Sequence, residues 1–427
     1  MKARVTILLL SICLVISTCA NHAAEDCADA WTAHSSPSSL TAGTGVNIHF
    51  IDPERGEIKM IADAGFRWVR TDFKWELTEN QRGVYDFAPY ERLVGALAEH
   101  HIRALFILDY GNPLYTADRS VRTEEARQAF ARWAVSAAKH FANRGVIWEL
   151  FNEPDIDIFW PPKPNVNEYI SLAEMVGRAW RAQAPNEILI GPATSAIDFP
   201  FVTECFKAGL LQYWSAVSIH PYRKTEPETV AADYCRLRNL IQSYSHGTAN
   251  PVPIISGEWG YSSAWRWVDE KQQADLLTRQ FLTNVANGIP ISIWYDWRDD
   301  GSDSNESEHH FGIVRHDLRQ NGEQPFEPKP SYFAAKTVNA FMKGSVFQKR
   351  LPLSDAQNFV LVFSNSGRER IAAWTTSSRP RQVSISLPTG TYTLTKSSGE
   401  RIRDVTVAEN GLSVEVSTSP VFIWPAH

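Results

Sequence analysis

The stretch 146-VIWELFNEPDIDIFW-160 decides the fold and directs the search for a function. It begins as a continuous apolar run, which is typical of a parallel strand that is buried on both faces. The run then breaks into Asn152, Glu153 and Pro154, and a proline cannot continue a central strand. A core strand that ends in a carboxylate predicts either a solvated loop acid or one member of a catalytic pair. The second interpretation requires another carboxylate elsewhere in the chain.

Seven further apolar runs lie between residues 44 and 298, and amphipathic stretches such as 124–145 separate them. Eight alternating βα units in about 300 residues predict a (β/α)8 barrel over residues 41–343. The competing prediction is a doubly wound sheet that binds a nucleotide, but no GxGxxG or GxxxxGK[ST] motif follows any run. The seven further runs are 44–50, 66–73, 103–110, 187–194, 214–221, 252–259 and 291–298.

After about residue 344 the pattern changes to alternating apolar and polar residues, which is typical of antiparallel strands with one buried face. Turn signals such as Ser366-Gly367 and Ser398-Gly399 separate these stretches. We predict a small antiparallel β-sandwich over residues 344–427, which a strand from residues 27–40 can complete. The alternating stretches are 358–365, 369–376, 382–387, 391–396 and 412–417.

Residues 1–24 predict an export signal. Two basic residues precede an apolar stretch from Val5 to about Ile16, which is too short for a stable membrane span. We therefore expect an exported protein, either periplasmic or secreted. Cys19 lies in a poor lipoprotein box, so a lipid anchor at this residue is the alternative.

The composition narrows the classes of partner. The net charge is −6 without a long basic run, which argues against nucleic acid. The 15 Trp, 13 Tyr and 21 Phe can stack on sugar rings, although a large core also explains them. Cys205 and Cys235 can pair in an oxidising compartment, and no cysteine spacing indicates a metal site. We expect a monomer without a metal or other cofactor.

Two glutamates occupy the positions where a barrel of this kind places its active site, the C-terminal ends of the strands. Glu153 follows the fourth run and Glu258 follows the seventh. Glycoside hydrolysis requires two such carboxylates, because one protonates the departing oxygen while the other attacks the anomeric carbon or activates water. Neighbouring aromatic residues would help to keep one of the two acids protonated near neutral pH.

The residues around both glutamates resemble a known group of enzymes. The Asn-Glu-Pro motif at 152–154 and the Ser-Gly-Glu-Trp-Gly motif at 256–260 resemble the clan A glycoside hydrolases, which are retaining enzymes with a (β/α)8 barrel. The chain after the signal is most similar to family 39, including its exopolysaccharide-degrading PslG-like members, which carry a C-terminal β-sandwich. Family 5 shares the two-glutamate pattern and is the nearest alternative.

The resemblance implies a role for each matching residue. Glu153 would be the general acid/base and Glu258 the nucleophile. Arg70 would hold Glu258 in its charged form, and Asn152 would bind the 2-hydroxyl group of the substrate. The other substrate-binding residues expected in the cleft are His220 and Tyr222 of 219-IHPY-222, Trp297 or Trp294 as the sugar platform, Asp109 and Trp160.

Structural interpretations stay open for several of these residues. Arg70 can belong to a structural ion pair, Asp109 can bond to neighbouring strand ends, and Trp160 can pack under its loop. The sequence as a whole predicts a retaining β-glycosidase that hydrolyses a polysaccharide or oligosaccharide by a two-glutamate double displacement. The alternative is a non-catalytic carbohydrate-binding protein that is built on the same barrel.

Overall fold

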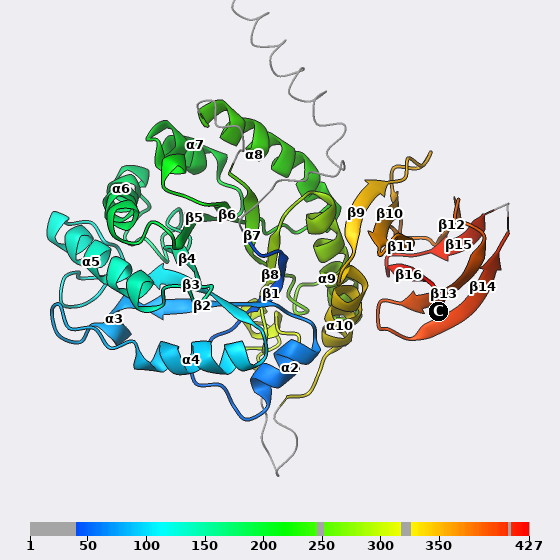
Figure 1. Ribbon diagram of the computed structural model, residues 1–427, viewed down its shortest axis with the longest axis horizontal. Helices are drawn as coiled ribbons and strands as arrows, with labels where there is room; N and C mark the ends of the chain where they lie inside the picture. Colours follow the sequence, from blue (N-terminus) through cyan, green and yellow to red (C-terminus); the bar gives the residue numbers. More distant parts are fainter. Residues whose placement is uncertain (1–39, 246–251, 317–325, 409–410, 427) are drawn as a thin grey trace, which may run out of the picture.

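Eight parallel strands close into a barrel in the order of the sequence, and β1 pairs with β8 (Figure 1). The computed structural model describes residues 40–245, 252–316, 326–408 and 411–426. The predicted (β/α)8 barrel is confirmed, and each of the eight apolar runs overlaps one strand. The strands are β1 (Gly43–Asn47), β2 (Trp68–Lys74), β3 (Arg103–Asp109), β4 (Ile147–Leu150), β5 (Ile188–Ser195), β6 (Val217–His220), β7 (Ile254–Trp259) and β8 (Ile291–Trp294).

The helices surround the barrel (Figure 1), and four of the described α-helices begin at a side chain that accepts a hydrogen bond from a free backbone N–H group. Thr123 caps one helix, and Asp269 forms a capping box with Gln272 at another. The helices are α2 (Glu57–Asp63), α3 (Trp75–Thr78), α4 (Ala88–Glu99), α5 (Glu124–His140), α6 (Val166–Gln183), α7 (Phe199–Lys207), α8 (Val230–Tyr244), α9 (Glu270–Ala286) and α10 (Pro330–Met342). Three short 3-10 helices are η1 (Leu210–Gln212), η2 (Pro227–Thr229) and η3 (Ser307–His310).

The interior of the barrel is apolar at the N-terminal ends of the strands and polar one layer above. Trp68 and Ile147 belong to a small buried cluster with other inward-facing aliphatic residues. Alternate residues of a strand share a face, so Arg70 and Glu149 point into the barrel directly above Trp68 and Ile147. Both charged residues are almost fully buried. The alternation of β2 and β4 therefore places a buried ion pair below the C-terminal face.

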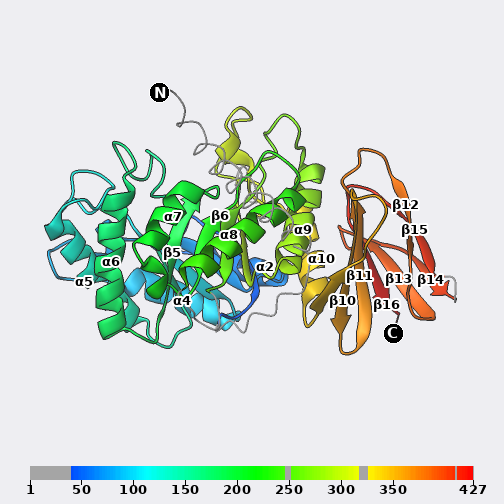
Figure 2. The ribbon, with the colours of Figure 1, turned by 90° about the horizontal axis from the view of Figure 1, so that it is seen from above.

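The C-terminal part is an antiparallel β-sandwich beside α9 and α10, as the sequence predicts (Figure 2). A six-stranded sheet has the order β14-β13-β16-β11-β10-β9, and β12 pairs with β15. Aliphatic side chains of both sheets form a core of their own. The strands are β9 (Val346–Arg350), β10 (Asn358–Asn365), β11 (Arg368–Thr375), β12 (Arg381–Ile385), β13 (Gly390–Lys396), β14 (Arg401–Val407), β15 (Leu412–Val416) and β16 (Val421–Pro425).

The cysteines correct one expectation. Cys205 is a fully buried free thiol on α7, whereas Cys235 on α8 is half-buried and disulfide-bonded. The pairing of these two residues, which the sequence left open, does not form, because Cys205 faces the core. The other three cysteines, the predicted export signal and residues 27–39 of the additional strand lie outside the described residues. No helix among the described residues is long and apolar enough to cross a membrane.

The sandwich is joined to the barrel through Trp374 of β11. Its indole is fully buried, stacks on Phe359 with ring centroids 5.1 Å apart, and donates a hydrogen bond of 2.6 Å to the buried Glu228 Oε1. Glu228 in turn accepts two hydrogen bonds of 2.7 Å from Arg279 of α9. An aromatic side chain on the barrel-facing side of the sandwich therefore also satisfies a buried carboxylate of the barrel.

We expect Trp374→Ala to lower the free energy of unfolding by about 3–5 kcal/mol, because it removes a large buried side chain and one donor to Glu228. Urea denaturation followed by tryptophan fluorescence measures the change. Val346→Ala is the control, because Val346 is 63% exposed, and it should change stability by less than about 0.5 kcal/mol. Equal effects of the two substitutions would show that Trp374 does not connect the two parts.

Candidate active site

The buried guanidinium of Arg70 forms hydrogen bonds to residues of several barrel strands. Its Nε donates to Glu149 Oε2 at 2.7 Å, and one terminal nitrogen donates to Asn152 Oδ1 at 2.7 Å. The other terminal nitrogen donates to Asn47 Oδ1 at 3.2 Å and to Glu258 Oε2 in a short contact. A guanidinium presents its donors in a rigid planar fork, so these contacts fix the relative positions of β1, β2, β4 and β7.

Glu149 is a site residue that the sequence analysis did not identify. It lies inside β4, is fully buried, and accepts hydrogen bonds from Arg70 and from Ser218 Oγ. The neighbouring Gly257 leaves room for this contact: a Cβ there would lie 2.3 Å from Ser218 Oγ and 2.8 Å from Glu149 Oε1. The available signal was a single charged residue within the apolar 147-IWEL-150. A buried charge of this kind requires a partner.

The chain turns sharply after β4, and the turn directs Asn152 and Glu153 to the C-terminal face of the barrel. Phe151 and Glu153 have φ angles of 68° and 42°, in the left-handed region that L-residues rarely adopt. The backbone N–H of Glu153 donates to the carbonyl of Ala193 on β5 at 2.9 Å. Strained backbone of this kind persists where the surrounding structure holds it, and it is frequent at functional sites.

Glu153 is in a setting that favours its protonated form. Its side chain is only 10% exposed, and its Oε1 lies 2.8 Å from His220 Nδ1. Burial raises the pKa of Glu153 to about 7; the charge of Arg70 opposes this shift and the charge of Glu149 adds to it. Glu153 is therefore a carboxylic acid that can give up its proton near neutral pH.

His220 connects Arg70 to Glu153 and is neutral. Burial, and then the charge of Arg70, lower the pKa of His220 to about 4. Arg70 can only donate, so Nε2 of His220 accepts its hydrogen bond of 3.1 Å and the imidazole proton lies on Nδ1. Nδ1–H then donates to Glu153. His220 is fully buried, so the expected substrate contact is wrong: the residue positions Glu153 instead.

Glu258 is held by donors at the end of β7. Its side chain is 12% exposed and accepts from Arg70 at one oxygen and from the Tyr222 hydroxyl at the other, at 2.8 Å. Both contacts stabilise a negative charge on this carboxylate. The structure therefore brings Glu153, Glu258, Arg70 and Tyr222 together. It also places Asn152 beside them, with its Oδ1 occupied by Arg70.

One carboxylate oxygen of Glu153 and one of Glu258 lie within 4.8 Å of each other, and His220 contributes a nitrogen within the same distance. Three such groups can hold a metal ion. Here Arg70 contacts both Glu258 and His220, so a metal cation would meet a guanidinium. The positive charge that this cluster needs is already present in Arg70.

A second cluster lies at the ends of β1 and β8, where His49, Asp296 and Asp300 are also close enough to share a cation. His49 Nδ1 lies 2.9 Å from Asp300 Oδ1. Burial lowers the pKa of His49, but the hydrogen bond to Asp300 and the charges of both aspartates outweigh it and raise the pKa to about 9. A protonated imidazole does not ligate a metal, so this cluster is an ion pair near neutral pH.

Neither Trp294 at the end of β8 nor Trp297 after it is a sugar platform, which corrects the prediction for both residues. Trp297 is 1% exposed and its indole N–H donates to Glu57 at 2.9 Å, toward α2. Trp294 is fully buried, and its N–H donates to the carbonyl of Phe311 at 3.3 Å. Between them, Tyr295 is half-buried and lies 6.4 Å from the ring of Tyr222. Tyr295 is therefore the aromatic residue that β8 directs toward the cleft.

Two further predicted substrate contacts are absent. Asp109 is fully buried, and both of its carboxylate oxygens are shielded from solvent. Burial and the nearby charge of Asp72 raise the pKa of Asp109 well above its usual value. Trp160 is also fully buried and donates to Glu168 at 2.9 Å, so it supports its loop. Neither side chain is available to a sugar.

Phe159, next to Trp160, faces a hollow of about 390 Å³ between the loops that follow β2, β3 and β4. It stacks on Tyr110 with ring centroids 5.5 Å apart and planes at 5°. Arg119 lies 5.2 Å from the Tyr110 ring and 5.7 Å from the Phe159 ring, and Lys74 also lines the hollow. Flat aromatic surfaces beside polar groups suit a saccharide.

Comparisons with known proteins agree on the type of fold. The model of the family described as cellulase (glycosyl hydrolase family 5) matches residues 33–300. A family 39 glycoside hydrolase from Bacteroides cellulosilyticus WH2 is 26% identical, with a TM-score of 0.77 over 91% of this chain and 81% of that chain. No curated protein sequence matches the chain.

Two more distant structures show the same fold. A monomeric β-xylosidase from Caulobacter crescentus CB15 is 16% identical, with a TM-score of 0.65 over 93% of this chain and 98% of that chain. A family 30 endoxylanase from Clostridium papyrosolvens C71 is 11% identical, with a TM-score of 0.64 over 92% of this chain and 98% of that chain.

We expect Glu153→Gln to remove one group that titrates near pH 7. The raised pKa means that folded wild-type protein retains a proton that an unfolded glutamate, with a pKa of about 4.3, has lost. Wild-type stability therefore falls between about pH 4 and pH 7 because of this group, and the variant should gain relative stability over that range. Potentiometric difference titration and urea denaturation at several pH values measure the two effects.

The control for this experiment is Glu124→Gln. Glu124 is exposed, and its hydrogen bonds to Gln128 and Arg127 lower its pKa. Its removal should leave proton uptake near pH 7 unchanged. A Glu153→Gln titration curve that differs from wild type only near pH 4 would contradict the proposed protonation state of Glu153.

Proposed function

The chain belongs to the cellulase family (glycosyl hydrolase family 5) of clan A, and we propose that it is a retaining β-glycosidase in which Glu153 and Glu258 perform a double displacement. The clan A resemblance seen in the sequence is thereby confirmed. The likeness to a family 39 enzyme at 26% identity agrees with the particular resemblance to that family.

The distance between the two carboxylates is the observation that carries the proposal. Carboxyl groups about 5–5.5 Å apart are typical of retention, whereas inversion needs about 6.5–9.5 Å to admit a water molecule. The closest oxygens of Glu153 and Glu258 lie within 4.8 Å. This spacing favours direct attack by one carboxylate over attack by an intervening water.

In the first step, Glu258 attacks the anomeric carbon while Glu153 gives its proton to the departing glycosidic oxygen. The bond from the anomeric carbon to that oxygen breaks, and an ester to Glu258 forms. Arg70 and Tyr222 hold the attacking carboxylate in its charged form and in a fixed orientation. The raised pKa of Glu153 supplies the proton at neutral pH.

In the second step, Glu153 is a carboxylate and acts as a general base. It takes a proton from a water molecule, whose oxygen attacks the anomeric carbon, and the ester bond to Glu258 breaks. Glu258 leaves as a carboxylate and Glu153 is again protonated, so two inversions retain the configuration. Nδ1–H of His220 holds Oε1 of Glu153 in place through both steps.

The surroundings favour a saccharide of several units as substrate. Because Oδ1 of Asn152 accepts from Arg70, its amide nitrogen is left to donate to the 2-hydroxyl group of the reacting sugar. The Tyr110–Phe159 pair offers an aromatic surface on one side of the carboxylates. On the β7 side, the half-exposed Trp265 and Trp267 stack on each other at 6.3 Å.

We further propose that the enzyme acts as a monomer outside the cytoplasm. The support is the export signal predicted from residues 1–24 and the likeness in fold to a β-xylosidase that is described as monomeric. The same neighbours act on xylose-containing substrates, so β-linked pentose and hexose oligosaccharides are the first substrates to test.

Azide rescue of alanine variants distinguishes the roles of the two glutamates. Glu153→Ala should lose about 10²–10⁴-fold in kcat on oligosaccharides, because it lacks the acid. Azide should restore turnover of an activated aryl glycoside and give a glycosyl azide of retained configuration. Glu258→Ala with azide should give the inverted product, since azide then attacks the sugar directly. Proton NMR of the products measures both.

Two results would contradict this assignment. If azide rescued Glu153→Ala with an inverted product, Glu153 would be the nucleophile and Glu258 the acid/base. Binding of oligosaccharides by the wild-type protein without hydrolysis of any, on a panel that includes β-xylosides and β-glucosides, would favour the non-catalytic alternative. Glu124→Gln, which alters a distant exposed carboxylate on α5, is the activity control.

We expect kcat/KM to fall as the pH rises through about 7, because Glu153 then gives up its proton. Glu149→Gln should move this alkaline limb to lower pH, because the charge of Glu149 raises the pKa of Glu153. Initial rates on an unactivated oligosaccharide between pH 4 and pH 9 measure the limb. A limb that moves to higher pH would contradict the electrostatic account.

A further inference from the structure

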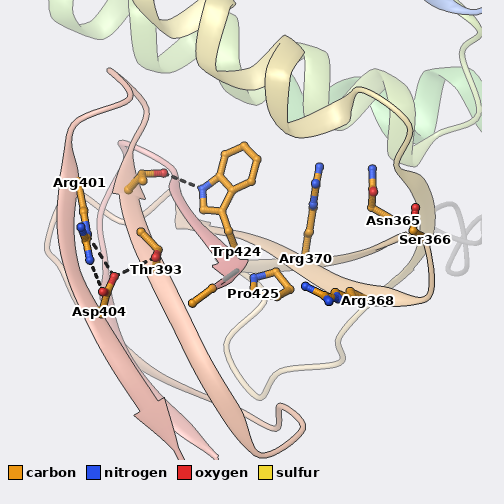
Figure 3. Close-up of a pocket in the computed structure, with 11 residues that line it drawn as sticks. Asn365, Ser366, Arg368, Arg370, Thr393, Arg401, Asp404, Trp424 and Pro425 are labelled. Atoms are coloured by element: carbon orange, nitrogen blue, oxygen red, sulfur yellow. Dashed lines mark hydrogen bonds and ion pairs between the residues drawn. The ribbon is translucent and has the colours of Figure 1, made fainter.

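One face of the six-stranded sheet is only partly covered by the barrel. Phe363 of β10 and Phe422 of β16 pack on Phe341 of α10, with ring centroids 5.1 and 4.6 Å apart. Alternation along the strands places Arg370 and Trp424 on the same face, farther from this contact. The uncovered part is the floor of a groove of about 760 Å³ (Figure 3).

The groove is positively charged. Arg368, Arg370 and Arg401 line it, and Asp404 is the acid among its lining residues. Asp404 is already paired with Arg401 and accepts a hydrogen bond of 2.8 Å from Thr393. Arg368 and Arg370 form no ion pair within the described part of the chain. Two cations of the groove therefore have no counter-charge there.

Arg370 is held in place without being neutralised. One terminal nitrogen donates to the carbonyl of Phe341 at 3.2 Å and to Ser345 Oγ at 3.3 Å, which ties the side chain to the end of α10. The residue is half-buried, and burial lowers the pKa of Arg370 from its usual value. A partly desolvated guanidinium is stabilised by an anion, and its planar fork fits a carboxylate.

Trp424 supplies an aromatic surface beside these arginines. Its indole N–H donates to Thr395 Oγ1 at 2.9 Å, and its ring meets Phe341 edge-on at 5.3 Å. The Arg370 guanidinium lies 5.2 Å from the centre of the ring. These contacts hold the half-buried indole upright from the sheet, next to Arg370 (Figure 3). An oriented aromatic ring next to charged and hydroxyl groups is suited to a sugar ring.

We propose that this groove binds a saccharide whose sugar units carry carboxylate groups, with the carboxylate on Arg368 and Arg370 and the sugar ring against Trp424. That the ligand is a saccharide rests on the proposed function; that it is anionic rests on the groove alone. The β-sandwich then holds an acidic glycan at a second site, apart from Glu153 and Glu258. The enzyme would thus favour substrates that contain uronate units.

Isothermal titration calorimetry on the full chain carrying Glu258→Gln, which prevents turnover, tests the proposal. The probes are oligouronates of four or more units, neutral xylo- and cello-oligosaccharides of equal length, and free glucuronate. We expect oligouronates to bind more tightly than neutral oligosaccharides, and added salt to weaken the binding. Adding Arg368→Gln should weaken oligouronate binding by about 10-fold, since it removes one charge-assisted contact.

Arg403→Gln is the matched control, because Arg403 is an exposed arginine of the same sheet, on the edge strand β14, and does not line the groove. It should leave oligouronate binding unchanged. Trp424→Ala should weaken the binding of oligouronates and not only of neutral sugars, and its melting temperature reports whether the fold is retained. Arg368 is exposed and its side chain forms no hydrogen bond within the described part of the chain, so Arg368→Gln tests the groove without disturbing the fold.

Equal affinity for neutral and acidic oligosaccharides would overturn the proposal, as would equal losses in Arg368→Gln and Arg403→Gln. Hydrolysis is measured separately with the wild-type protein. If oligouronates bind through Arg368 but no glycan is hydrolysed, the proposed function is wrong and the proposal that the groove binds acidic glycans is supported. If glycans are hydrolysed but Arg368→Gln binds oligouronates as tightly as its parent, only the groove fails.

Discussion

The buried guanidinium of Arg70 is the group on which the site depends. A charge with 1% exposure is costly to hold unless it is fully paired, and Arg70 meets two carboxylates, two amide oxygens and one imidazole nitrogen. These partners come from β1, from β4 and the turn after it, from β6 and from β7. Removing either carboxylate would leave charge uncompensated in the interior, and removing a neutral partner would leave a buried donor unpaired, so the network fixes the geometry of the C-terminal face.

The same guanidinium makes the two glutamates different. It contacts Glu258 directly and favours its negative charge, whereas it reaches Glu153 only through the neutral His220. Burial then decides the state of Glu153, whose pKa rises to about 7. Two residues of one type thus have different surroundings, because Glu258 has donors beside it and Glu153 is desolvated.

One part of the six-stranded sheet of the sandwich packs against the barrel, and another part of the same face is left uncovered. Apolar side chains of its six-stranded sheet, together with Trp374, close against α10 and the buried Glu228. The outer part of the same face keeps arginines and an indole that the barrel does not cover. A sheet whose alternation supplies apolar residues at one end and charged residues at the other can both attach to a domain and present a binding surface.

The sequence by itself determined the eight barrel strands, the bounds of β10 and the two glutamates, because continuous apolar runs, alternation and strand-end motifs are local signals. It did not identify β9 and the charged edge strand β14, whose residues are mostly exposed and show little apolar alternation, or the proline-flanked β16, which pairs with the distant strands β11 and β13. Only the tertiary structure shows where the side chains of Glu149, Trp297 and Trp160 point and what they contact. Whether a side chain at a strand end faces the cleft, the core or a helix depends on packing from other elements, and no local pattern encodes that direction.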